Sequence, residues 1–171
     1  AKMKAFAVKL VILNLYAASQ PDFRVDLIIR GICCLKPQVP GVSDNIHVRS
    51  IVGRFLEHSR IYYFHHNGDE NLFLSSADMM TRNMIKRIEI EFPILDKAIK
   101  KEILSLMDVY LADNTKAREL HPDGTYRHVR NNRPAVDAQK YFMELANKEK
   151  EIPILAEKDS WFKKIQRRLK K

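Results

Sequence analysis

Short apolar runs separated by polar loops predict a sheet of short strands in the first half of the chain. We expect strands at residues 25–29, 46–52, 61–64 and 72–74. The first run is apolar at almost every position, which is typical of a strand buried on both faces in a parallel sheet that helices cover. Residues 87–92 alternate strictly between polar and apolar, so they predict a half-buried strand that ends at Pro93.

Apolar residues at helical spacing predict helices that pack on this sheet. Residues 5–19 form the first, with an apolar face made of Phe6, Leu10, Leu13 and Ala17. Asp96 is placed to cap a second helix, which runs to about residue 112 and carries an apolar stripe. Residues 135–148 form another. Strands and helices together predict an α/β fold with a mixed sheet flanked by helices.

Turn residues mark the connections. Two prolines and a glycine in residues 37–41 indicate a surface loop that either borders a site or merely joins two strands. Asn67 and Gly68 form the strongest hairpin-turn signal, and we interpret the two histidines before them as exposed turn residues rather than metal ligands. Residues 118–133 are rich in arginine and histidine. We interpret them as a polar connector, with a route for a polyanion chain as the alternative.

Length and composition fit one domain with a tail. A chain of 171 residues that is 46% hydrophobic can form a single core. We expect a domain over residues 1–150 and a basic, helical tail over residues 151–171. The tail places Trp161, Ile165 and Leu169 on one face, which we expect to dock on this domain or on a neighbouring subunit. Contact with a membrane surface or a polyanion is the alternative.

Membrane and redox signals are weak. No apolar run approaches the roughly 18 residues that a membrane span needs, and the amino terminus does not resemble a signal peptide. We therefore expect a cytoplasmic protein, with peripheral association at a membrane as a second option. Cys33 and Cys34 are adjacent, so they are poorly placed for a disulfide or a zinc site and we expect them to be reduced.

Positive charge is concentrated in the tail. The chain has a formal net charge of +9, and residues 159–171 contribute more than half of that excess. The rest of the chain is modestly basic, which fits a polyanion substrate, either polyphosphate or nucleic acid.

Two polar clusters at strand ends predict a phosphate site. Arg30 directly follows the strand at residues 25–29, and ligands of open α/β sheets bind outside the carboxyl ends of strands. Its guanidinium is a planar fork of donors, so Arg30 is a candidate phosphate clamp. His58 and Arg60 directly precede the strand predicted at residues 61–64. In an extended chain alternate side chains point to the same side, so these two residues lie on one face. Histidine suits proton transfer or phosphoryl chemistry.

A third cluster follows the strand at residues 72–74. Ser76, Asp78 and Arg82, together with Arg60, are candidates for the lining of the same pocket. Turn formation and helix capping by Ser or Asp are the alternative. Asp78 either orients His58 or pairs with an arginine, and the sequence leaves both open.

Several segments, taken in order, resemble the carboxyl-terminal region of bacterial polyphosphate kinase, the enzyme that builds inorganic polyphosphate from ATP. They are VDLIIRGICCLKP, GVSDNIHVRSIVGRFLEHSRIYYF, NLFLSSADMMTRN, RIEIEFPI and, more weakly, LADNTKAREL and DGTYR. Motifs that recur in order over about 140 residues are far more specific than one short pattern.

This resemblance implies a phospholipase D-like fold and a share in a kinase active site. Arg30 and His58 match family positions that contact the nucleotide phosphates, and His58 matches a histidine proposed to assist the transfer. In the family, the phosphorylated histidine and the magnesium-binding positions lie in upstream domains. The implied ligands are ATP or ADP, Mg²⁺ and inorganic polyphosphate. The implied partners are those upstream domains and further copies in a homo-oligomer, and no nucleic acid is expected.

Two departures from the phospholipase D pattern argue against independent phosphodiester hydrolysis. Arg60 stands where that pattern has lysine, and Ser75-Ser76-Ala77-Asp78 replaces its Gly-Ser-x-Asn element. We therefore expect a truncated domain of a polyphosphate kinase that is inactive alone. It would contribute to reversible transfer of the terminal phosphoryl group of ATP. The alternatives are a noncatalytic polyanion-binding module and a phospholipase D-like nuclease or lipase half-domain.

Overall fold

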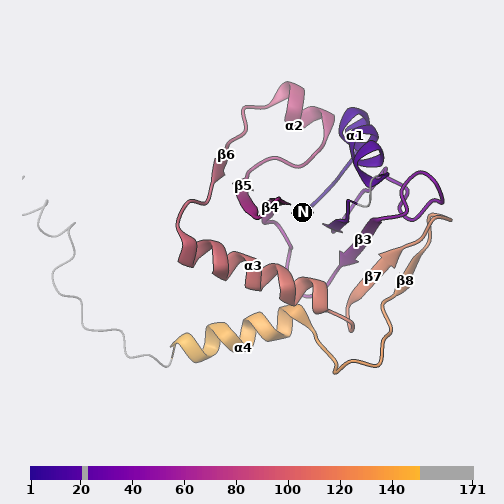
Figure 1. Ribbon diagram of the computed structural model, residues 1–171. Coiled ribbons are helices and arrows are strands. Elements are labelled where there is room, and N and C mark those ends of the chain that lie inside the picture. Colours follow the sequence, from indigo (N-terminus) through magenta and orange to yellow (C-terminus); the bar gives the residue numbers. More distant parts are fainter. Residues whose placement is uncertain (21–22, 151–171) are drawn as a thin grey trace, which may run out of the picture. The chain divides into compact units, whose positions relative to one another are not determined.

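The computed structural model describes residues 1–20 and 23–150, and the chain divides into two units, Ala1–Gln139 and Lys140–Lys171 (Figure 1). The strands of the first unit are β1 (Lys2–Met3), β2 (Val25–Ile29), β3 (Ile46–Ile51), β4 (Arg60–His66), β5 (Asp69–Ser75), β6 (Glu91–Pro93), β7 (Ala117–Leu120) and β8 (Tyr126–His128). The helices are α1 (Lys9–Ser19), α2 (Thr81–Lys86), α3 (Lys97–Ala112) and α4 (Ala138–Lys150). The predicted tail helix at residues 151–171 lies outside the described residues, and the predicted boundary at residue 150 stays a prediction.

All eight described strands form one mixed sheet in the order β6-β5-β4-β1-β2-β3-β7-β8. β1, β2 and β3 are parallel, whereas β4 and β7 run antiparallel to β1 and β3. The carboxyl ends of the three parallel strands therefore meet the first residues of β4 and β7. We call this side of the sheet the carboxyl edge; it carries Lys4, Arg30, Arg60, Ser76 and Lys116. The mixed sheet with its helices confirms the predicted α/β class.

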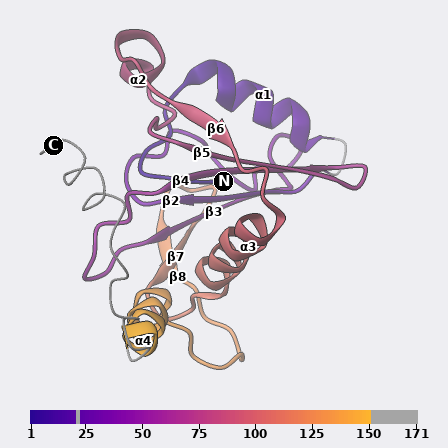
Figure 2. The ribbon, with the colours of Figure 1, turned by 90° about the vertical axis from the view of Figure 1, so that its left-hand side faces the viewer.

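Helices cover both faces of the sheet. Figure 2 shows α1 and α3 on opposite sides of it. Leu27 and Ile29 of β2 belong to the core that contains Ile12 of α1, whereas Ile28 belongs to the core that contains Ile103 of α3. The prediction of a strand buried on both faces is therefore confirmed. None of the described helices is long and apolar enough to span a bilayer. Cys33 and Cys34 are both free.

The apolar face predicted for residues 5–19 is wrong. The helix begins only at Lys9, and Leu10 and Leu13 are 68% and 50% exposed. Phe6 is buried, but it lies before the helix in an extended segment whose backbone bridges Cys33. The cause is long-range pairing: the start of the chain fills the middle of the sheet, which delays the helix and changes the face that it buries.

The strand predicted at residues 87–92 is wrong in its extent and burial. Only Glu91–Pro93 form a strand, and Ile88 and Ile90 are 101% and 64% exposed. The amide of Ile90 donates to Oγ of Ser76 at 3.1 Å, and the amide of Ser76 donates to the Ile90 carbonyl at 3.0 Å. These two hydrogen bonds stand in place of the longer series of strand-to-strand hydrogen bonds that a strand over residues 87–92 would form. β6 is the last strand of the described sheet, so alternation alone did not ensure burial.

Two hairpins shape the sheet. The predicted turn is confirmed, because Asn67 and Gly68 both have positive φ angles, 46° and 89°, as the tight turn between twisted strands requires. The polar connector predicted at residues 118–133 is wrong in part, because it contains the hairpin of β7 and β8. This hairpin pairs Arg118 with His128.

Asp96 caps α3, as predicted. Its Oδ1 accepts hydrogen bonds from the amides of Ala98 at 2.8 Å and Ile99 at 3.0 Å. We expect Asp96→Ala to lower the free energy of unfolding by about 1 kcal/mol, because these amides lose their acceptor, and Asp96→Asn to lower it less. Urea denaturation followed by circular dichroism measures both. Glu102→Ala, an exposed change on the same helix, is the control, and an equal loss in that variant would contradict the capping role.

Candidate functional site

Strand register brings Arg30 and the segment from His58 to Arg60 to the carboxyl edge. β1 lies between β2 and β4, with Met3 opposite Ile29 and Lys2 opposite Ile61. Neighbouring strands are about 4.8 Å apart, so the backbones of β2 and β4 are separated by roughly 10 Å. Two clusters that are distant in sequence are thus neighbours on one edge.

Asp78 organises this edge. Its Oδ1 accepts a hydrogen bond from the amide of Lys4 at 2.8 Å, and its carboxylate accepts two from Arg60, at 3.2 Å and 3.1 Å. The side chains of Arg60 and Asp78 are only 10% and 4% exposed. Asp78 therefore pairs with an arginine and acts on His58 only through it.

Arg60 in turn holds His58. Its Nη1 lies 3.1 Å from Nδ1 of His58 and donates to the His58 carbonyl at 2.9 Å. A guanidinium has donors only, so Nδ1 accepts and the ring hydrogen of neutral His58 is on Nε2. His58 is exposed, which leaves this Nε2–H donor available to a ligand.

A second buried ion pair fixes the residue before His58. Nζ of Lys2 lies 3.1 Å from Oε2 of Glu57 and 4.8 Å from the centre of the Tyr110 ring, and Gln139 donates to Oε1 of Glu57 at 2.7 Å. Burial lowers the pKa of Lys2, and the charge of Glu57 opposes that shift. The sequence carried no signal for this cluster, because its members come from four distant segments.

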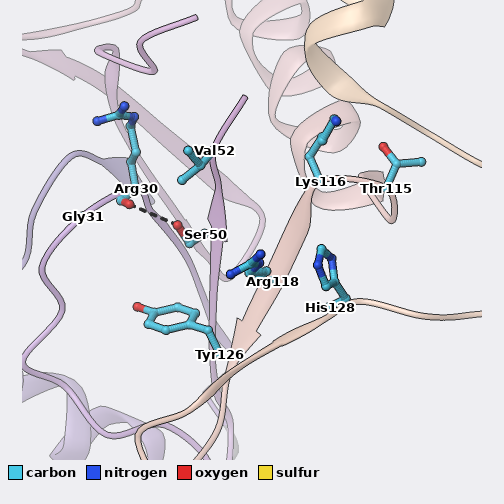
Figure 3. Close-up of a pocket in the computed structure, with 9 residues that line it drawn as sticks. All are labelled: Arg30, Gly31, Ser50, Val52, Thr115, Lys116, Arg118, Tyr126 and His128. Atoms are coloured by element: carbon cyan, nitrogen blue, oxygen red, sulfur yellow. Dashed lines mark hydrogen bonds between the residues drawn. The ribbon is translucent and has the colours of Figure 1, made fainter. Parts of the chain in front are cut away.

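A cavity of about 570 Å³ opens beside Arg30 (Figure 3). It is lined by Arg30, Gly31, Ser50, Val52, Thr115, Lys116, Arg118, Tyr126 and His128. Nε of Arg30 is buried and has no hydrogen-bond partner among the described residues. Buried donors are usually paired, so the missing acceptor at Nε means that the described residues do not hold the Arg30 guanidinium by a hydrogen bond at this nitrogen.

The other predicted pocket residues do not line this cavity. Oγ of Ser76 donates to the carboxylate of Glu89, and Arg82 is exposed on α2. Neither these residues nor His58 and Asp78 line the cavity beside Arg30. Contact of His58, Ser76 or Arg82 with a ligand stays a prediction.

The carboxyl edge does not fit a magnesium site. Mg²⁺ prefers carboxylate oxygens, but Glu57 and Asp78 are already paired with Lys2 and Arg60. No cluster of three or more potential metal ligands occurs among residues 1–20 and 23–150.

The mixed sheet and its helices define an α/β domain of the phospholipase D-like class, here with arginines and lysine along one edge. Residues 1–139 match the family model "Polyphosphate kinase C-terminal domain 2". The chain belongs to the polyphosphate kinase family.

Relatives and a solved structure agree with this assignment. The chain is 49% identical over 182 residues to a polyphosphate kinase of Staphylococcus haemolyticus, which covers 99% of this chain and 25% of that protein. It is 53% identical over 147 residues to one of Bacillus cereus, covering 85% and 21%. The crystal structure of polyphosphate kinase from Porphyromonas gingivalis superposes with a TM-score of 0.82 at 40% identity, covering 88% of this chain and 23% of that one. The chain thus spans about a quarter of the length of these proteins.

The Asp78 network predicts a specific acid sensitivity. Burial alone would raise the pKa of Asp78, but hydrogen bonds from Arg60 and the Lys4 amide outweigh burial and hold the pKa below its ordinary value of 3.8. Since the folded pKa is the lower one, ionised Asp78 stabilises the fold above about pH 4, and this contribution is lost as the pH falls through the folded pKa.

We expect Asp78→Asn to lower the free energy of unfolding at neutral pH by about 3 kcal/mol, because Arg60 is left buried without its counterion. The variant should also lose less stability than the unaltered chain below about pH 4. Urea denaturation across the pH range measures both effects. Asp69→Asn, an exposed change at the opposite end of the sheet, is the control, and identical acid profiles for the Asp78 variant and the unaltered chain would refute the assignment.

Proposed function

We propose that this chain is part of an ATP:polyphosphate phosphotransferase and contributes Arg30 and His58 to its active site. The observation that carries the proposal is the register of β2, β1 and β4, which supports the meeting of both residues at one edge. Membership of the polyphosphate kinase family supports adenine nucleotide and inorganic polyphosphate as substrates.

Arg30 would neutralise phosphate charge. Arg30 is half-buried and its Nε has no acceptor among the described residues, and preorganised donors stabilise charge that redistributes during phosphoryl transfer. Asp78 and Glu57 are each paired with another cation, and no ion pair of Arg30 occurs among residues 1–20 and 23–150.

His58 would donate a hydrogen bond to the moving phosphoryl group. Arg60 occupies Nδ1, so the neutral ring offers Nε2–H rather than a lone pair at its free nitrogen. This tautomer favours stabilisation of phosphoryl oxygens over removal of a proton.

The reaction divides between this chain and another part of the enzyme. The bond between the terminal phosphorus of ATP and its bridging oxygen breaks and releases ADP. The phosphoryl group bonds to a histidine nitrogen of an upstream domain. That phosphorus–nitrogen bond then breaks as a terminal oxygen of the polymer bonds to the phosphorus, and the histidine is released. The magnesium ligands are expected outside the described residues.

A chimera tests the proposal. Residues 1–139 of this chain would replace the matching segment of the Staphylococcus haemolyticus polyphosphate kinase. We expect ATP-dependent polyphosphate synthesis, measured as ADP release and polymer formation. Phosphodiester cleavage without synthesis would instead favour the nuclease or lipase alternative.

Within the chimera, we expect Arg30→Gln to lower kcat/KM by about 100-fold, because a preorganised donor to the phosphates is lost. Arg24→Gln, just before the opposite end of β2, is the matched control and should change little. Equal turnover of the two variants would remove Arg30 from the site.

We expect His58→Ala to lower kcat, and His58→Gln to restore part of the loss, because the glutamine amide supplies a donor near the position of Nε2 but transfers no proton. His65→Ala, an exposed change near the far end of β4, the strand that follows His58, is the control. Steady-state kinetics compare the three. Equal defects in the alanine and glutamine variants would favour proton transfer, and unchanged turnover in both would favour a noncatalytic polyanion-binding module.

A further inference from the structure

The cavity beside Arg30 extends away from His58. The strand order places β1 and β4 on one side of β2, and β3, β7 and β8 on the other. The cavity is lined by residues of β3, β7 and β8, together with Arg30 and Gly31 from the end of β2. Arg30 therefore stands between the His58 cluster and this cavity.

Positive charge dominates the cavity. The cations Arg30, Lys116 and Arg118 line it beside the imidazole of His128, and none of its nine lining residues is acidic. Figure 3 shows Arg118 between Ser50 and His128, which agrees with the register that pairs Arg118 with both. Arg118 therefore lies between a hydroxyl and an imidazole, and both groups can donate a hydrogen bond to an anion that Arg118 binds.

The donors follow one another across the sheet. Ser50, Arg118 and His128 occupy successive strands, so they repeat at intervals of about 4.8 Å. A linear chain of condensed phosphates carries its charge at regular intervals and matches such a row. Val52 and Tyr126 are the only hydrophobic side chains of the lining, which gives a nucleobase little apolar surface.

We infer that this cavity binds a segment of inorganic polyphosphate, on the opposite side of Arg30 from His58. The inference rests on the proposed function, and in it Lys116, Arg118 and His128 bind the polymer. The hairpin of β7 and β8 then serves substrate binding.

The test measures binding of sodium polyphosphate of defined length, and separately of ATP, to the 171-residue chain by calorimetry. We expect Arg118→Gln and Lys116→Gln each to weaken polyphosphate binding by about tenfold, since each removes a charge-assisted contact, and to leave ATP binding within about twofold. Both residues are exposed, so each variant tests the cavity independently if the other folds poorly. Arg130→Gln makes the same charge change outside the cavity and should have little effect.

Three results would overturn the inference: no polyphosphate binding by the unaltered chain, equal weakening by Arg118→Gln and Arg130→Gln, or a loss confined to ATP. The chimera separates this outcome from the proposed function. If the chimera makes no polymer while Arg118→Gln still weakens polyphosphate binding, the proposed function fails and the cavity assignment stands. If synthesis proceeds and Arg118→Gln binds polyphosphate normally, only the cavity assignment fails.

Discussion

The ion pair between Asp78 and Arg60 is the interaction on which the carboxyl edge depends. Burying a carboxylate costs several kcal/mol unless partners compensate it. Asp78 receives them from two directions, the Arg60 guanidinium and the Lys4 amide. Asp78, which follows the carboxyl end of β5, thereby fixes the carboxyl end of β1 and the start of β4. Because Arg60 then holds His58, the geometry of an exposed imidazole follows from a buried charge.

The cationic side chains of the carboxyl edge are of two kinds, those that are paired with a buried carboxylate and those that are not. Lys2 and Arg60 are buried beside carboxylates and hold segments together. Arg30, Lys116 and Arg118 line a cavity without acidic residues, and Nε of Arg30 is left without an acceptor among the described residues. Net charge alone does not separate these kinds, because a paired arginine and an unpaired one count equally. Only the second kind is suited to an anion.

Local patterns predicted the elements that depend on local physics. The continuous apolar run of β2, the cap at Asp96 and the turn at Asn67 each carry their cause within a few residues. Failures arose where distant segments decide. The start of the chain pairs in the middle of the sheet instead of extending the helix. The alternating residues near Ile88 lie beside the edge strand of the sheet, where they remain exposed. For Asp78 the sequence predicted either an arginine partner or contact with His58 and could not choose between them. The spacing of residues along the chain does not determine which side chains meet across strands.

The tautomer of His58 also limits the chemistry that its ring can perform. Neutral imidazole has one ring lone pair, and in His58 that lone pair on Nδ1 faces Arg60. Nε2 carries the hydrogen, so the ring can hold a phosphoryl oxygen but cannot attack phosphorus without first giving up Arg60. Under the proposed function, the covalent carrier of the phosphoryl group would therefore be a residue other than His58. The buried pair that fixes the orientation of His58 is thus also what makes it a poor nucleophile.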